Sequence, residues 1–251
     1  MSVHFAGVGV GIAVSAVMVS GALALGADWR GLWFAVGAIM LCAAVFVGWL
    51  VPEDYGRRGR TGGVAAPPRR HGLGRLIGAY GLFGFGYVVT ATFLVAIVRG
   101  MPAARGIEPL VWLVVGITAA PSVALWSWAG ARFGLRQAFG LASLVEAVGV
   151  AASVSWPSAT GALIAAALLG GTFVGLTALG LAEARDLAPL DPRPAFALMT
   201  AAFGLGQVVG PLLAGFLADR TGGFAVPSLL AAAALVMASI VVQSVPAPRT
   251  L

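Results

Sequence analysis

The sequence contains no lysine and a single cysteine, and charged residues make up only 10% of its 251 positions. About a quarter of the residues are charged in an ordinary soluble domain, so this composition excludes that class. Cys42 can form no internal disulfide and belongs to no cluster of metal ligands. The sequence therefore predicts neither a disulfide bond within the chain nor a metal site.

Motifs of common enzymes are also absent. The sequence has no H-E-x-x-H motif, no G-x-S-x-G motif and no Walker loop. Its two histidines, His4 and His71, lie at an expected helix start and in an expected loop. We therefore expect a protein without enzymatic activity and without a cofactor. The alternative with enzymatic activity is an intramembrane enzyme.

All 15 basic residues are arginine, and the calculated isoelectric point is near 11.0. A basic balance of this kind also occurs in proteins that bind nucleic acid. Here the arginines are concentrated in short loops between apolar stretches, where they set the orientation of a membrane protein. We therefore expect a lipid bilayer as the partner, and no nucleic acid.

Hydrophobic residues make up 60% of the chain, and the mean hydropathy is +0.98. Apolar stretches long enough to cross a bilayer recur from end to end, which predicts an all-α, polytopic membrane protein. The first stretch is too long and too rich in glycine for a signal peptide, so we count it as a span. The eight expected spans are 4–26, 31–51, 74–98, 108–129, 135–156, 158–182, 195–217 and 224–246.

Arginine is distributed unevenly between the two sides of these spans. Eleven of the 15 arginines lie on one side, which we term the arginine-rich side, and four lie on the other. Cytoplasmic loops carry the excess of positive charge in helical membrane proteins. We therefore expect an inner-membrane protein with both termini in the cytoplasm. The arginine-poor side holds Arg30, Arg99, Arg105 and Arg220.

The one sizeable loop divides the spans unequally. Residues 52–73 are rich in glycine, proline and arginine, which is typical of a flexible linker. We expect two spans in residues 1–51, this cytoplasmic linker, six spans in residues 74–246, and a short cytoplasmic tail at 247–251.

The stretch 198–220 holds no charge before Asp219, although it contains several residues that disfavour a soluble helix. In a bilayer such residues mark bends and close helix contacts. Pro211 should kink the helix and leave a carbonyl group free to line a cavity. Two pairs of small residues have the spacing of helix-packing motifs: Gly206 with Gly210, and Gly7 with Gly11.

The first two spans are similar to the last two. Gly9 and Gly11 followed by Ser15 have the spacing of Gly204 and Gly206 followed by Gly210, and both spans lead to a turn with an aspartate. A parallel repeat of this kind is typical of two transporter halves. If the halves are equivalent, the first half here has only its last two spans. We expect the helices 7–26 and 198–217 to meet across the interface between halves.

At this point the chain resembles the major facilitator superfamily, and within it the YbfB/YjiJ-type transporters. The likeness covers nearly the whole chain, and the eight spans resemble helices 5 to 12 of twelve, without the first four. One turn departs from the family pattern. The family often has the sequence Asp-Arg-x-Gly-Arg-Arg there, whereas this chain has Ala131 at the position of the aspartate. The likeness is carried by residues 80–87 with 90–93, residues 179–185 and residues 199–215.

This resemblance implies a major facilitator-type fold and secondary transport of a small solute by rocking of two halves. Because the sequence has no ATP site, transport must use a gradient, and protons are the expected coupling ion. An alternative is a truncated or mis-started fragment without transport of its own, or one that needs a missing N-terminal half as a partner. A cavity with few charges suits a neutral or amphiphilic solute.

Several polar and aromatic side chains are candidates for the substrate cavity. Tyr80, Phe83 and Tyr87 share one helix face at i, i+3 and i+7, and Thr90 follows them. The resemblance places this helix beside the family's cavity, and the alternative is an aromatic packing stripe. Gln207 is the strongly polar side chain of its span, so it needs either substrate or a hydrogen bond to another helix.

Four charged residues near the arginine-rich side are candidates for a cytoplasmic gate: Arg132, Arg136, Glu183 and Arg185. Glu146 lies deeper, near the centre of span 135–156. A carboxylate at that depth costs about 2.5–3.5 kcal/mol on insertion, which makes it a functional candidate. We expect Glu146 either to couple transport to protons or to serve as a structural acid between helices; the resemblance places it on a helix that is usually peripheral.

Overall fold

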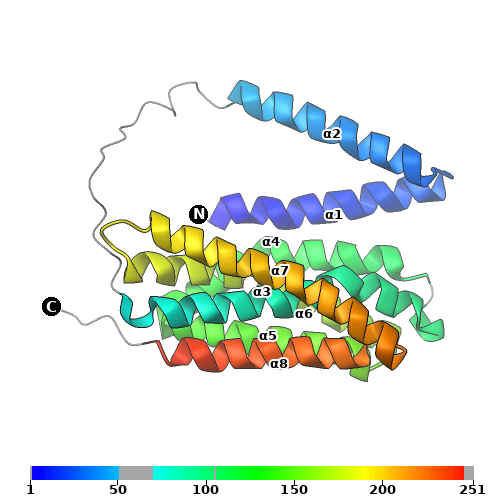
Figure 1. The fold of residues 1–251 in the computed structure, drawn as a ribbon. Coiled ribbons are helices and arrows are strands. Elements are labelled where there is room, and N and C mark those ends of the chain that lie inside the picture. Colours follow the sequence, from blue (N-terminus) through cyan, green and yellow to red (C-terminus); the bar gives the residue numbers. More distant parts are fainter. Residues whose placement is uncertain (1, 51–69, 105, 246–251) are drawn as a thin grey trace.

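The computed structural model describes residues 2–50, 70–104 and 106–245 (Figure 1). Its elements are long α-helices with one short 3₁₀ helix, and these residues form no strand. In chain order they are α1 (Ser2–Ala24), α2 (Trp29–Leu50), α3 (Arg70–Arg99), η2 (Pro102–Ala104), α4 (Glu108–Phe133), α5 (Leu135–Ser155), α6 (Ala159–Leu187), α7 (Arg193–Thr221) and α8 (Ala225–Gln243).

Eight of these helices are long and apolar enough to cross a membrane, which confirms the all-α, polytopic fold. Helices α6 and α7 each run for 29 residues and extend beyond the expected spans. A helix of that length measures about 43 Å at 1.5 Å per residue, whereas the hydrocarbon layer is about 30 Å thick. The last turns of α6, which carry Glu183 and Arg185, therefore continue as helix into the interfacial region.

Helix α3 begins at Arg70, before the expected start at residue 74, so the end of the expected linker is already helical. The rest of the linker, residues 52–69, lies outside the described residues, as does the tail 247–251. We use "arginine-rich end" below for the end of the molecule at which α1, α3, α5 and α7 begin.

Helices α3 to α8 form a six-helix bundle (Figure 1). Helix α3 packs against α6, α7 and α8, while α5 packs against α6 and α8. Glycine permits a close approach of α3 and α7. A Cβ atom added at Gly206 would lie 2.6 Å from the backbone nitrogen of Phe85 and closer still to the carbonyl oxygen of Gly81. Gly206 and Gly210 are both buried at this contact, so the packing pair expected on α7 lies between two helices of the bundle.

Helix α1 packs along α4, on the outside of this bundle. Gly9 of α1 lies directly on the backbone of Ala119 and Ala120, and Gly116 of α4 lies on Ala13. An added Cβ atom at either glycine would approach those residues to less than 3.0 Å. Two small-residue surfaces therefore bring the α1 and α4 backbones together.

This arrangement corrects two expectations. The partner of α1 is α4, whereas α7, which holds the stretch 198–217, packs mainly against α3 and α8. Gly7 and Gly11 also do not form the close contact, because a Cβ atom added at either would meet nothing within 4 Å. Each is two residues from Gly9, which corresponds to about 200° around a helix, so both point away from α4.

Helix α2 stands apart from the bundle and has no buried residue (Figure 1). Its large apolar side chains are open to the surroundings on every face; Trp33, for example, is 73% exposed and Trp49 is 81% exposed. Side chains of this kind are stable in contact with lipid, so the exposure of α2 fits a membrane environment.

Both interior prolines lie inside continuous helices. Helix α7 passes through Pro211 and α4 passes through Pro121 without a break. A proline cannot donate to the carbonyl group four residues earlier, so each helix lacks one internal hydrogen bond at that point. Pro121 directly follows the two alanines on which Gly9 of α1 packs, a position at which α4 is easiest to bend.

The glycine contact between α3 and α7 leads to a stability prediction. Gly206→Leu should destabilise the protein by about 1–3 kcal/mol or more, because the new side chain must displace backbone at the contact. Gly204→Leu is the matched control on the same helix, since nothing lies within 4 Å of a Cβ atom there. Thermal unfolding in detergent, followed by tryptophan fluorescence, should show a lower midpoint for the first variant only; equal midpoints would contradict this packing.

Candidate functional site

A polar and aromatic centre joins three helices of the bundle. The Tyr87 ring of α3 stacks on Phe173 of α6 and on Phe203 of α7, with ring centroids 5.9 and 5.4 Å apart. Gln207 Nε2 of α7 donates a hydrogen bond to the Tyr87 hydroxyl group at 2.5 Å. The two polar side chains therefore satisfy each other in this conformation, and of the two outcomes expected for Gln207 the structure has the interhelical hydrogen bond.

The other aromatic residues of this face lie deeper in the bundle. Tyr80 and Phe83 are 3% and 0% exposed, and the Phe83 ring lies 5.7 Å from Tyr80 and 5.3 Å from Tyr87. In this conformation the face from Tyr80 to Phe83 is a packing stripe, and Tyr87 is its partly exposed end.

Glu146 of α5 is completely buried. Neither of its carboxyl oxygens has a hydrogen-bond partner among the described residues. Thr172 of α6 lies beside it, but the Thr172 hydroxyl group donates to the carbonyl oxygen of Leu168 at 2.6 Å. An ionised carboxylate without a partner is strongly disfavoured in apolar surroundings, whereas a proton on the group removes the charge. The position suits a group that gains and loses a proton.

A second polar group without a partner lies at similar depth. Thr90 of α3 is 0% exposed, and its hydroxyl oxygen has no hydrogen-bond partner in the described part of the chain. Phe83 of α3 contacts Phe139 of α5 with centroids 6.1 Å apart, and the two helices run in the same direction. Thr90 and Glu146 each follow seven residues later, so the two unsatisfied groups lie at about the same level between the helices.

At the arginine-rich end, an ion pair ties three helices together. Arg136 Nε of α5 donates to Glu183 Oε1 of α6 at 2.8 Å, and the two side chains are 17% and 7% exposed. Arg136 Nη1 also donates to the carbonyl oxygen of Val245, just beyond the end of α8, at 2.5 Å. Terminal carbonyl groups carry the negative end of a helix dipole, so an arginine there is favourable.

The turn before α5 aims Arg136 at this site. Only Gly134 separates α4 from α5, and its φ of 97° is a conformation that side chains disfavour. Arg75 of α3 adds a further contact, because its guanidinium group donates to the carbonyl oxygen of Ser244. The other two gate candidates, Arg132 and Arg185, are exposed and have no salt bridge to a described residue.

A cavity of about 680 Å³ lies at the opposite end, where α1 faces the ends of α3 and α4. The α1 wall extends from Ile12 to Leu23, whereas Gly9 nearer the arginine-rich end is in close contact with α4. Phe5 adds to that closed part by packing on a small cluster of α4 and α6 residues. Helix α1 therefore meets the bundle tightly at one end and leaves an open space at the other.

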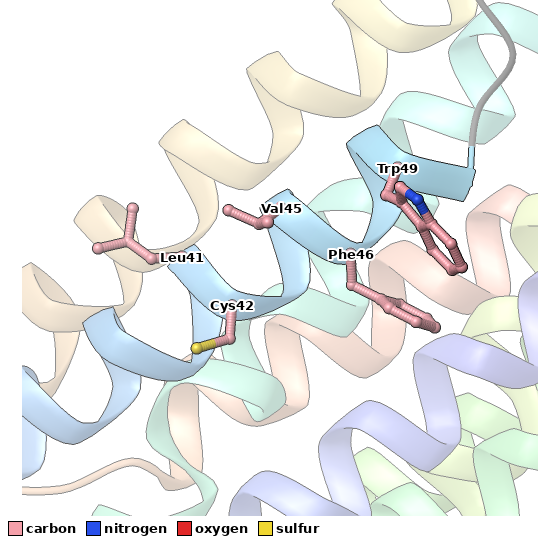
Figure 2. Close-up of a pocket in the computed structure, with 5 residues that line it drawn as sticks. All are labelled: Leu41, Cys42, Val45, Phe46 and Trp49. Atoms are coloured by element: carbon pink, nitrogen blue, oxygen red, sulfur yellow. The ribbon is translucent and has the colours of Figure 1, made fainter.

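The hollow shown in Figure 2 has a different character. Its volume is about 500 Å³, and all its lining residues belong to the exposed helix α2. It brings no polar groups of different helices together, so we do not treat it as a site. The lining residues are Leu41, Cys42, Val45, Phe46 and Trp49.

Several residues of the site did not stand out in the sequence. Phe173 and Phe203 stack on Tyr87, but Phe173 is the one aromatic residue of span 158–182 and Phe203 is one of three in span 195–217. Gly9 lies in the noticed repeat of glycines, but choosing it over Gly7 and Gly11 requires the rotation of α1 about its axis. No group of three or more potential metal ligands occurs among the residues that the structure describes.

A family model described as "Uncharacterised MFS-type transporter YbfB" matches residues 1–243, which is nearly the whole chain. No curated protein matches the sequence.

The buried ion pair leads to a prediction on how the stability effects of its two partners combine. Arg136→Met and Glu183→Gln should each destabilise the protein by about 3–5 kcal/mol, because each leaves an uncompensated group in a buried position. The double variant should lose clearly less than the sum of the two. Thermal or denaturant unfolding in detergent measures all three, with Arg132→Met as the exposed control. Strictly additive losses would show that the pair does not act as a unit.

Proposed function

The chain belongs to the YbfB family of MFS-type transporters, and we propose that it moves a small solute across the membrane by alternating access, coupled to protons. The cavity between α1 and the six-helix bundle is the observation that carries the proposal. The fragment without transport of its own gains no support from a match over residues 1–243. The same membership supports the absence of enzymatic activity.

The position of α1 supports alternating access. In our proposal, the close contact of Gly9 with α4 and the packing of Phe5 close the arginine-rich side, while the cavity opens on the other side. We place the arginine-rich side in the cytoplasm of a cell with an inner membrane, so this conformation faces outward. Rocking of α1 on the small residues of α4 would close the cavity and open the cytoplasmic side.

The Tyr87 and Gln207 pair is our candidate for the inner end of the solute path. The two side chains are partly exposed and belong to different helices, α3 and α7. A solute with a hydrogen-bonding group could replace either partner, and this exchange would loosen the contact between the helices. Binding would thus favour a different arrangement of α3 and α7, as the coupling of a ligand to a conformational change requires.

Glu146 is our candidate for the proton carrier. Its carboxyl oxygens are buried without a hydrogen-bond partner among the described residues, and Tyr87, one partner of the proposed solute contact, is a titratable group in its electrostatic surroundings. A proton on Glu146 would let α5 keep its buried position, and loss of the proton would favour a conformation in which water reaches the carboxyl group. The Arg136–Glu183 pair, by contrast, acts as a fixed support at the arginine-rich end, with its charges already paired.

Replacement of Glu146 tests the coupling. Proteoliposomes with the purified protein would be given a pH gradient, and currents would be recorded on a solid-supported membrane for a panel of neutral, anionic and cationic solutes. We expect a solute-evoked current that depends on the pH gradient in the wild type and is absent from empty liposomes. Glu146→Gln should retain solute exchange without a gradient, and its pH-driven current should be at least tenfold smaller than that of the wild type.

Ser143→Ala is the matched control, because Ser143 is buried one turn earlier on α5 and does not titrate in this range. It should keep the pH-driven current. An unchanged pH-driven current in Glu146→Gln would remove the carrier role, and the absence of any solute-evoked current from folded wild-type protein would argue against transport.

A further inference from the structure

The cavity between α1, α3 and α4 combines an apolar wall with one ion pair at its end. Arg99 Nε and Nη2 both donate to Glu108 Oε2, at 3.2 and 2.8 Å. Both residues line the cavity, together with Trp112 one turn further along α4. This combination is unusual in a chain of which only 10% of the residues are charged. We propose that the cavity binds an amphiphile with a single chain and a carboxylate head, and that Arg99 holds the head.

The free side of the ion pair favours a negatively charged head. Arg99 bonds only one oxygen of Glu108, so the end of its guanidinium group still has N–H donors on Nη1 and Nη2. Its side chain is 70% exposed, whereas that of Glu108 is 29% exposed. The arginine is therefore the more accessible partner, and two parallel N–H groups match the geometry of a carboxylate.

The length of the cavity favours a chain behind that head. The lining residues of α1 recur at helical spacing and form one continuous face from Ile12 to Leu23. The eleven helical steps from Ile12 to Leu23 span about 16 Å, which extends from the level of Arg99 towards the middle of the bilayer. Apart from two serines this face is apolar: Ile12, Ser15, Ala16, Val19, Ser20 and Leu23.

The two serines do not make the wall strongly polar. Ser15 and Ser20 donate their hydroxyl hydrogens back to carbonyl groups of α1, those of Ile12 and Ala16. A volume of about 680 Å³ lies within the range of about 300–1,000 Å³ that is usual for small-molecule pockets. The cavity thus has the size and the polarity gradient of a site for an amphiphilic acid.

This inference rests on the proposed function only in taking the cavity as the place where the solute enters, and binding can be measured without transport. The purified protein would be placed in nanodiscs of phosphatidylcholine and titrated with 11-bromoundecanoate, whose bromine quenches tryptophan fluorescence. The difference between the wild type and Trp112→Phe reports quenching at the cavity. We expect saturable quenching that decanoate reverses and that decyltrimethylammonium and acetate do not.

Two variants test the contacts. Arg99→Gln should weaken binding about tenfold, the effect of losing one hydrogen bond to a charged group, and Arg30→Gln, an exposed arginine on the same side, should leave it unchanged. Val19→Phe narrows the apolar wall and should also weaken binding; an unfolding midpoint equal to that of the wild type shows that the variant is folded.

Equal quenching in Arg99→Gln and Arg30→Gln would overturn the proposal, and so would displacement by decyltrimethylammonium that is as effective as displacement by decanoate. Displacement by phosphatidylglycerol added to the nanodisc would also overturn it, because that result would assign the site to a bilayer lipid. Saturable binding without any decanoate-evoked current would support the site and argue against transport of this class of solute. A decanoate-evoked current without saturable quenching at Trp112 would argue against binding in this cavity and would support transport of this class of solute.

Discussion

The close contact between α1 and α4 is the constraint on which the arrangement of the molecule depends. Gly9 and Gly116 remove the side chains that would separate the two backbones, so α1 lies directly on α4 near the arginine-rich end. In a bilayer, helices are not driven together by the hydrophobic effect, and such close packing is the main source of attraction. A contact of small residues also presents a smooth surface, which suits movement better than interlocking side chains would.

The polar groups divide the bundle into fixed and adjustable parts. The Arg136–Glu183 pair and the end of α8 satisfy one another at the arginine-rich end, which makes α5, α6 and α8 a firm unit there. Further inside, Glu146 and Thr90 have no hydrogen-bond partner among the described residues. Unsatisfied buried groups are expensive and are retained where function needs them. The unsatisfied pair therefore marks the region in which a change of state would relieve an existing cost.

Much of the fold could be predicted from the sequence, because long apolar stretches in a bilayer have few alternatives to a helix. All eight spans were found in this way. The site was less accessible. Spacing places Tyr80, Phe83 and Tyr87 on one face, but only tertiary packing decides that the first two are buried and the third is partly exposed. The partner of α1 was predicted wrongly, since glycine spacing indicates a close contact and does not identify the opposite helix.

The central claim is that α1 rocks against α4, and distances between the two helices test it most directly. In a Cys42→Ser background, spin labels would be placed at Ala24 and Leu110 near the cavity, and at Val8 and Ala124 near the closed contact, all exposed positions. Pulsed electron–electron double resonance in nanodiscs should show a change in part of the population when the pH or the decanoate concentration is changed. The distance near the cavity should shorten, and the distance near the closed contact should lengthen. Two single distances that stay constant under every condition would contradict the account.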